Sequence, residues 1–109
     1  MSYSVITIHT FEKQAKRLLK KYPSLKQELS ELISSLKLNP EQGTPLGNNS
    51  FKIRLSISSK GKGKSGGARV ITHLYIQNTT VILLTIFDKS EQSNITDNDI
   101  RLLLKQIPF

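Results

Sequence analysis

The sequence contains no cysteine. This absence excludes disulfide bonds, thiolate metal ligands and cysteine nucleophiles, and it fits a protein of the reducing cytoplasm. Long apolar runs are also missing, because no stretch approaches the ~20 residues that a membrane-spanning helix needs. The first residues, MSYSVITIHTF, lack the basic start and the apolar centre of a secretion signal. We therefore expect a cytoplasmic protein without a membrane partner.

Acidic residues are absent from the middle of the chain. Residues 42–87 carry six of the 16 basic side chains and no carboxylate, whereas the whole chain has a net charge of +8. The six basic residues are Lys52, Arg54, Lys60, Lys62, Lys64 and Arg69. A field of one sign confined to one part of a small domain attracts a polyanion, and nucleic acid is the expected one.

The same absence limits the metal chemistry that we expect. Metal-dependent nucleases need clustered carboxylates, and the basic block has none. A zinc site lacks ligands, because the chain offers only His9 and His73. Gly63-Lys64-Ser65 resembles the end of a phosphate-binding P-loop, but that motif needs glycine where the chain has Ser58 and a helix where we predict a strand. We expect neither a metal nor a cofactor.

The length of the chain allows one modest core, so we expect a single domain over residues 1–109. Alternation over Tyr3–Ile8 predicts a first strand. Thr10 is the candidate N-cap of a helix that begins at Phe11. One face of this helix is apolar. Another face carries a basic stripe formed by Lys13, Lys16, Arg17 and Lys20. This stripe is either a solvated face of the helix or a second contact to phosphate.

A second helix follows the break at Pro23. Ser24 and Gln27 have the spacing of a capping box, and the helix ends at Asn39-Pro40. Residues 41–50 are rich in glycine, proline and asparagine, so we predict a loop there.

Two strands carry the basic residues of interest. Phe51–Ile57 alternates strictly, which predicts a strand with Lys52 and Arg54 on one face and apolar residues on the other. A glycine-rich stretch then predicts a flexible hairpin, and Ala68–Ile76 predicts the return strand. One face of that strand carries Arg69, Ile71, His73 and Tyr75.

The rest of the chain completes the fold. Val81–Phe87 is apolar nearly throughout, which is typical of a central strand. Thr96 is the candidate N-cap of a last helix, with Asp97 and Asp99 in its first turn. The order is β-α-α-β-β-β-α, and short turns make the last three strands an antiparallel meander. We predict an α+β fold: an antiparallel sheet with helices mainly on one face and the cations on the other, partly open, face.

Two segments resemble a known family. The runs KIRLSISSKGKGKSGGARVI and VILLTIFDKSE are similar to the RelE/ParE superfamily of toxins from bacterial toxin–antitoxin pairs, and most to its RelE/HigB-like branch. The resemblance covers nearly the whole chain. It implies an endoribonuclease that cuts messenger RNA, often on the ribosome, and a cognate antitoxin that blocks it. The ParE branch shares the fold but inhibits DNA gyrase, so the fold alone leaves both activities open.

Cleavage of RNA can proceed without a metal, because the 2′-hydroxyl of RNA is the nucleophile. The protein must align that oxygen, stabilise the charge of the phosphorane and move two protons. Arg54 and Arg69 are the candidate charge stabilisers, because a guanidinium held on a strand can bind two phosphate oxygens. Lys52 is a candidate base if the surrounding positive charges favour its neutral form, or a charge stabiliser if it stays protonated.

The groups that move the protons are less clearly indicated. Some family members carry a tyrosine near the C-terminus that takes part in proton transfer, but this chain ends in QIPF. His73 and Tyr75 share a face with Arg69 and are the candidate replacements, or else ordinary cross-strand residues.

The remaining charges have two interpretations each. The loop lysines are either RNA-binding residues or merely solvated side chains, as loop lysines commonly are. This group of candidates is Lys60, Lys62, Lys64 and Lys89. Asp88 and Glu91 either pair with Lys89 or Arg101, or hold the hairpin in place.

Three functions follow from these observations. The first is a metal-independent endoribonuclease that cuts messenger RNA on the ribosome and is blocked by an antitoxin. The second is a ParE-like gyrase inhibitor that leaves RNA intact. The third is a non-catalytic RNA-binding module. The lysine-rich hairpin and the pair Lys52 and Arg54 favour the first function.

Overall fold

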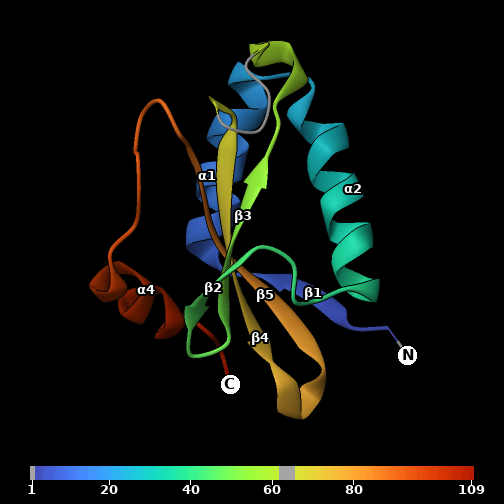
Figure 1. Ribbon diagram of the computed structural model, residues 1–109, viewed down its shortest axis with the longest axis vertical. Helices are drawn as coiled ribbons and strands as arrows, with labels where there is room; N and C mark the ends of the chain where they lie inside the picture. The colour runs from blue at the N-terminus through green and yellow to red at the C-terminus, as the bar shows by residue number, and fades with distance from the viewer. Residues whose placement is uncertain (1, 62–65) are drawn as a thin grey trace.

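The computed structural model describes residues 2–61 and 66–109. Within them the chain forms an α+β fold with a five-stranded sheet in the order β1-β5-β4-β3-β2 and three helices, α1, α2 and α4 (Figure 1). The predicted fold class is confirmed. No helix in this part of the chain is both long and apolar enough to cross a membrane.

The predicted meander forms the centre of the sheet. Strands β3 (Ser50–Leu55), β4 (Ala68–Tyr75) and β5 (Thr80–Asp88) pair antiparallel, and β5 is buried at every position. Strand β1 (Ser4–Thr7) differs from the prediction, because it pairs with β5 in parallel. No hairpin joins these two strands, so no turn imposes an antiparallel arrangement on them.

The loop predicted over residues 41–50 is wrong in part, because it contains the edge strand β2 (Thr44–Gly47). Strand β2 pairs antiparallel with β3, and Gly47 lies opposite Ser50. The two residues between them, Asn48 and Asn49, both have positive φ, 53° and 61°. Such a two-residue turn is favoured in hairpins, and asparagine tolerates it. The asparagine pair therefore marks a hairpin that composition alone suggested was a loop.

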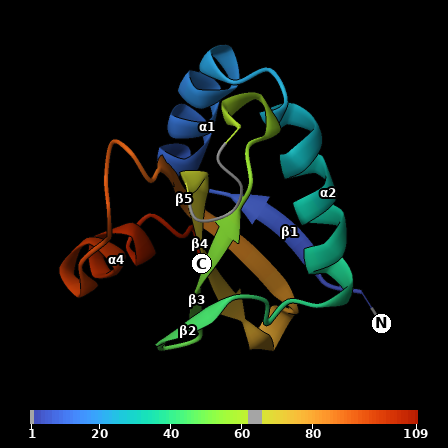
Figure 2. The same cartoon turned by 45° about the horizontal axis from the view of Figure 1, so that its top comes forward.

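Two helices cover one face of the sheet (Figure 2). Helix α1 (His9–Lys21) buries Phe11, Ala15 and Leu18. Helix α2 (Leu25–Leu38) buries four leucines at helical spacing. Both apolar faces agree with the periodicity of the sequence, because the buried positions recur every three or four residues.

Neither predicted side-chain cap of these helices forms, although Ser24 is at the N-cap position of α2 as predicted. Thr10 lies inside α1, whose N-cap is Ile8, and its hydroxyl and the side chain of Gln106 are hydrogen-bonded at 2.8–2.9 Å. Ser24 is the N-cap residue of α2, but its hydroxyl donates to Glu28 and contacts the hydroxyl of Ser59. In each case a partner distant in sequence takes the side chain that would otherwise cap the helix.

The last helix agrees with the sequence in detail. Helix α4 (Asp97–Leu104) begins with a capping box, in which the Thr96 hydroxyl accepts from the Asp99 amide at 3.0 Å and the Asp99 carboxylate accepts from the Thr96 amide at 3.3 Å. The helix buries Ile100 and Leu103. Leu103 lines a cavity together with Thr85 of β5. Thr85 lies opposite Ile71 on the face of the sheet that α1 and α2 do not cover, which we call the second face. Helix α4 therefore covers part of the second face.

We expect Gly43→Ala to destabilise the protein more than Gly47→Ala does. The two glycines have φ values of 97° and 88°, so each alanine adds backbone strain of ~1–2 kcal/mol. A Cβ atom at Gly43 would lie 2.4 Å from the carbonyl oxygen of Lys52, whereas one at Gly47 would meet nothing within 4 Å. The overpacking adds about 1–3 kcal/mol for Gly43→Ala alone. Urea unfolding measures both losses, and equal losses would contradict this packing.

Candidate nucleic-acid interface

The register of β3 and β4 brings the predicted cations together. Arg54 lies directly opposite Arg69, and Lys52, two residues earlier on β3, lies opposite Ile71. Residues directly opposite each other in an antiparallel pair project from the same face. Lys52, Arg54 and Arg69 therefore share the second face of the sheet, as the sequence predicted. We call these three residues the cationic cluster.

The two arginines differ in burial. Arg54 is exposed, whereas Arg69 is only 5% exposed and its Nη1 donates to the carbonyl oxygen of Ala68 at 3.1 Å. Burial lowers the pKa of Arg69, and the positive charge of Arg54 lowers it further. Like charges directly opposite each other destabilise a sheet. The fold therefore holds two like charges directly opposite each other on neighbouring strands.

His73 and Tyr75 lie further along the same face of β4. His73 lies opposite Ser50, and the Ser50 hydroxyl is 3.3 Å from His73 Nδ1. Burial lowers the pKa of His73, so its neutral form dominates at neutral pH. The Tyr75 hydroxyl donates to Gln77 at 3.3 Å, and the ring of Tyr75 lies 4.9 Å from that of Phe109. His73 therefore has a form that can accept a proton, whereas Tyr75 packs against the C-terminal residue.

A buried carboxylate lies at the end of β5. Asp88 is completely buried and forms an ion pair with Lys60. The other oxygen of the Asp88 carboxylate accepts from the Tyr22 hydroxyl at 2.6 Å. The amide and the hydroxyl of Ser90 donate, at 2.9 and 2.7 Å, to the carboxylate oxygen that also pairs with Lys60. Each oxygen of this carboxylate therefore has hydrogen-bonding partners.

The partners of Asp88 decide its charge state. Burial alone would raise the pKa of Asp88, but hydrogen bonds from Lys60, Tyr22 and Ser90 outweigh it and hold the pKa far below its usual range. The side chain of Lys60 is 9% exposed. Of the two interpretations given for Asp88, the structure agrees with the one in which it holds the hairpin, because Lys60 lies in the connection between β3 and β4.

The other predicted charges lie in different places. Lys62 and Lys64 are outside the described residues. The side chain of Lys89 is partly exposed, and its amide donates to the Gly67 carbonyl at 3.0 Å. Glu91 pairs with Arg17 of the basic stripe at 2.8 Å and with Lys21 at 3.6 Å. The basic stripe is exposed along its length, and Glu91 neutralises part of it.

Sequence reasoning missed the roles of Tyr22 and Ser90. The periodicity of the first helix places Tyr22 on its apolar face, and nothing in the sequence indicates that its hydroxyl has a partner 66 residues away. The one available signal was Asp88 itself, a carboxylate directly after a continuous apolar strand, because a charge at that depth needs partners. Among the residues described, no group of three or more histidine or acidic side chains is placed to hold a metal ion.

Comparisons with known proteins identify the family and agree with the fold. The family model described as the RelE toxin of the RelE/RelB toxin–antitoxin system matches residues 8–107. The fold is similar to that of a free double-arginine mutant of the Escherichia coli toxin RelE, with a TM-score of 0.67, 14% identity, and coverage of 98% of this chain and 99% of that one. It is also similar to a chain of the Mycobacterium tuberculosis toxin–antitoxin complex RelBE2, with a TM-score of 0.60, 19% identity, and coverage of 81% and 99%.

We expect Asp88→Asn to lower the free energy of unfolding by about 3–5 kcal/mol at neutral pH, because Lys60 would keep a buried charge without its counter-ion. The double variant Asp88→Asn, Lys60→Met removes both charges and should recover most of the loss. Urea unfolding measures both. A single variant as stable as the wild type would contradict the role of this ion pair.

The same ion pair predicts a pH dependence. The pKa of Asp88 is lower in the folded state than in the unfolded state, so its contribution is fully present above the unfolded value of ~3.9. That contribution is lost as the pH falls below this value. The difference in unfolding free energy between wild type and Asp88→Asn should therefore shrink on acidification, and a constant difference would count against the assignment.

Proposed function

The chain belongs to the RelE toxin family, and on that premise we propose that it is an endoribonuclease that cuts messenger RNA on the ribosome. The observation that carries the proposal is the juxtaposition of Arg54 and Arg69 on one face of the sheet, with Lys52 beside them. Strands hold these groups in fixed positions, which suits them to stabilise a charge that develops at one phosphate.

In the proposed reaction the 2′-oxygen of one nucleotide attacks the adjacent phosphorus, the bond to the 5′-oxygen breaks, and a 2′,3′-cyclic phosphate forms. Arg54 and Arg69 bind the non-bridging oxygens, because a guanidinium can donate two parallel hydrogen bonds to a phosphate. The attraction between the two guanidinium groups and the phosphate oxygens increases as the phosphorane gains negative charge. Binding is therefore stronger in the transition state than in the ground state.

Two protons must move in this reaction, one from the 2′-hydroxyl and one to the 5′-oxygen. His73 is the candidate acceptor of the proton from the 2′-hydroxyl. Burial lowers its pKa, and it lies on the same face of β4 as Arg69. Lys52 is the second candidate for a proton-transfer role, because it lies on the same face of the sheet as the two arginines. Tyr75 is a weaker candidate, because its ring packs on Phe109.

An antitoxin is the proposed protein partner, and RNA and the ribosome are the proposed polyanions. The complex RelBE2, which has this fold in one of its chains, supports the first proposal. The positive charge of the cluster supports both, because an acidic segment of a protein and a phosphate backbone compete for the same cations.

We expect Arg69→Ala to reduce cleavage of messenger RNA by about 10²–10³-fold, by analogy with the loss of one donor to a developing oxyanion. The assay incubates the protein with translating ribosomes in a chelator and maps the cut ends by primer extension. The cut ends should carry 2′,3′-cyclic phosphates. Arg101→Ala is the matched control, because Arg101 is an exposed arginine of α4 outside the cationic cluster.

Other outcomes of this assay would identify the alternatives. Full-length message with wild-type protein, together with inhibition of gyrase supercoiling, would identify a ParE-like inhibitor. Full-length message with RNA binding that weakens steeply with salt would identify a non-catalytic RNA-binding module.

We expect Arg54→Gln to raise the free energy of unfolding by about 0.2–1 kcal/mol while it lowers cleavage, because it removes a like charge directly opposite Arg69. Lys52→Gln is the control for stability, since Lys52 lies opposite Ile71 and faces no cation across the strand. Urea unfolding should show a gain for Arg54→Gln alone. A loss of stability in Arg54→Gln would contradict the repulsion between the two arginines.

A further inference from the structure

A cavity of about 330 Å³ lies on the second face of the sheet, between β5, helix α4 and the segment that joins them. Leu102 and Leu103 of α4 and Ile95 of the joining segment provide its apolar lining. In Figure 1 the joining segment runs out from the end of β5 and returns through α4, on the side of the sheet away from α2. The polar lining of the cavity comes from Thr85, Gln92, Asp99 and Gln106. A mixed lining of this kind suits a flat ligand with apolar faces and polar edges.

The cavity lies beside the cationic cluster. Thr85 lies opposite Ile71 on β4, and Ile71 lies opposite Lys52 on β3, so the three residues form one row across the second face. Arg69 lies opposite Phe87, two residues from Thr85, so Arg69 and Thr85 are diagonal neighbours on adjacent strands. Such neighbours are ~7–8 Å apart. The base of a nucleotide whose phosphate is bound by Arg69 can therefore reach the cavity.

The Thr85 side chain brings a buried polar group to this cavity. Thr85 is only 8% exposed, and its hydroxyl has no hydrogen-bond partner within residues 2–61 and 66–109. Buried polar groups in folded proteins are nearly always hydrogen-bonded, and a hydroxyl can both donate and accept. A ligand with a polar edge in the cavity would supply the partner of this hydroxyl.

Two further side chains bring hydrogen-bond acceptors to the cavity. The Gln92 side-chain amide donates to the Asn94 carbonyl at 2.9 Å, which leaves the side-chain oxygen of Gln92 as an acceptor. One oxygen of the Asp99 carboxylate accepts from the Thr96 amide, and the other has no partner in the described part of the chain. The negative charge of Asp99 disfavours a phosphate in the cavity. The lining therefore favours an uncharged ligand that supplies hydrogen-bond donors.

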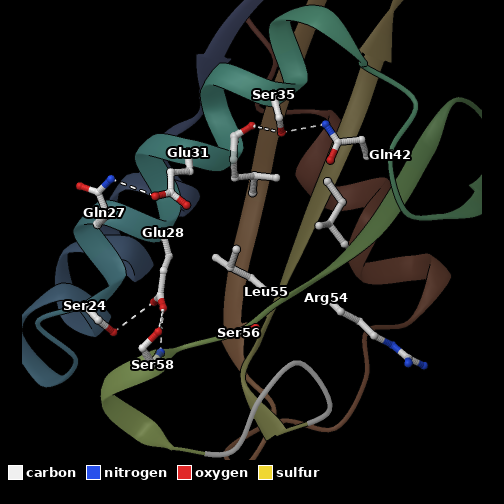
Figure 3. A pocket seen from close by; sticks show the side chains of 12 residues that line it. Ser24, Gln27, Glu28, Glu31, Ser35, Gln42, Arg54, Leu55, Ser56 and Ser58 are labelled. Atoms are coloured by element: carbon white, nitrogen blue, oxygen red, sulfur yellow. Dashed lines mark hydrogen bonds between the residues drawn. The ribbon is translucent and has the colours of Figure 1, made fainter.

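A larger cavity lies on the other side of the sheet, between α2 and β3 (Figure 3). Its lining includes the carboxylates Glu28 and Glu31 of α2. The side chain of Arg54 points away from these carboxylates, as Figure 3 shows. A nucleotide bound by the cationic cluster is therefore close to the cavity beside β5 and is separated by the sheet from the cavity beside α2.

We propose that the cavity between β5 and α4 binds one base of the RNA, and that this base carries an exocyclic amino group. The inference rests on the proposed binding of RNA phosphate by the cationic cluster. The faces of the base contact Ile95 and Leu102, and its amino group donates to Gln92 and Asp99. The Thr85 hydroxyl bonds to the ring nitrogen next to the amino group. Adenine, cytosine and guanine carry such a group, whereas uracil does not, so the cavity disfavours uracil.

The test compares two hexanucleotides of 2′-O-methyl RNA, hexacytidine and hexauridine, labelled for fluorescence anisotropy and added to the intact protein. Methylation of the 2′-oxygen blocks cleavage, so the assay measures binding whether or not the protein is a ribonuclease. The two probes share their backbone and ring size, and they differ at the edge that carries the amino group of cytosine. We expect hexacytidine to bind about tenfold more tightly, as for the gain of one hydrogen bond.

Two threonine variants test the place of the base. Thr85→Val removes the hydroxyl from the cavity at nearly the same volume, and we expect it to weaken hexacytidine binding about tenfold. Thr72→Val is the matched control, because Thr72 is also buried and its hydroxyl has no hydrogen-bond partner in the described structure. Thr72 follows Ile71 on β4 and so projects from the other face of the sheet. It should leave binding unchanged.

Further variants separate the base from the phosphate. Gln92→Ala should bring the affinity for hexacytidine close to that for hexauridine, whereas Gln27→Ala, at an exposed glutamine of α2, should not. Arg69→Ala should weaken both hexanucleotides by a similar factor, because the two share their phosphates. Free cytidine, which has no phosphate, should not compete with hexacytidine. In methyl NMR spectra the signals of Ile95 and Leu102 should shift with hexacytidine.

The outcomes distinguish this inference from the proposed function. Equal affinity for the two hexanucleotides, with Arg69→Ala weakening both, would overturn the base site and leave the phosphate contact intact. So would equal binding of hexacytidine by Thr85→Val and Thr72→Val. Competition by free cytidine would identify a nucleoside site and overturn the inference, as would failure of both probes to bind. Preference for hexacytidine that depends on Thr85 would support the base site even if the ribosome assay shows no cleavage.

Discussion

The pairing of β3 with β4 is the constraint on which the rest of this molecule depends. One register places Arg54 opposite Arg69 and so creates the cationic cluster on the second face of the sheet. The same register turns the main-chain groups of Arg54 away from β4. A shift of one residue would move every side chain of β3 to the opposite face and bury Lys52 and Arg54 under the helices.

This arrangement of like charges lowers the stability of the folded protein. Opposed arginines repel each other, and a single cross-strand repulsion of this kind costs about 0.2–1 kcal/mol. The central strand β5 offsets that cost, because its side chains are buried along its whole length. The ion pair of Asp88 and Lys60 adds a constraint next to the site, since it ties the β3–β4 connection to the end of β5. The cationic cluster is thus held in an unfavourable arrangement by a well-packed sheet.

Elements with strong local signals could be predicted from the sequence, and those that depend on distant partners could not. The alternation of Phe51–Ile57, the apolar run of Val81–Phe87 and the capping box at Thr96 each depend on residues within a few positions, and each is confirmed. Thr10 does not cap α1, and Ser24 is at the N-cap of α2 without a side-chain cap bond, because Gln106 and Ser59 hydrogen-bond to these hydroxyl groups. Strand β2 was missed because an asparagine pair can close a hairpin or occupy a loop.

The sequence by itself determined the fold class and the face of each strand on which a side chain lies, because alternation is a property of neighbouring residues. The resemblance of two of its runs to known toxins indicated the family. Only the tertiary structure decided which residues oppose each other. The side chain of Asp88 binds Lys60 and Tyr22, and β2 pairs with β3 only as far as Lys52. These outcomes depend on register and on the packing of α2, which arise from contacts between residues far apart in the chain.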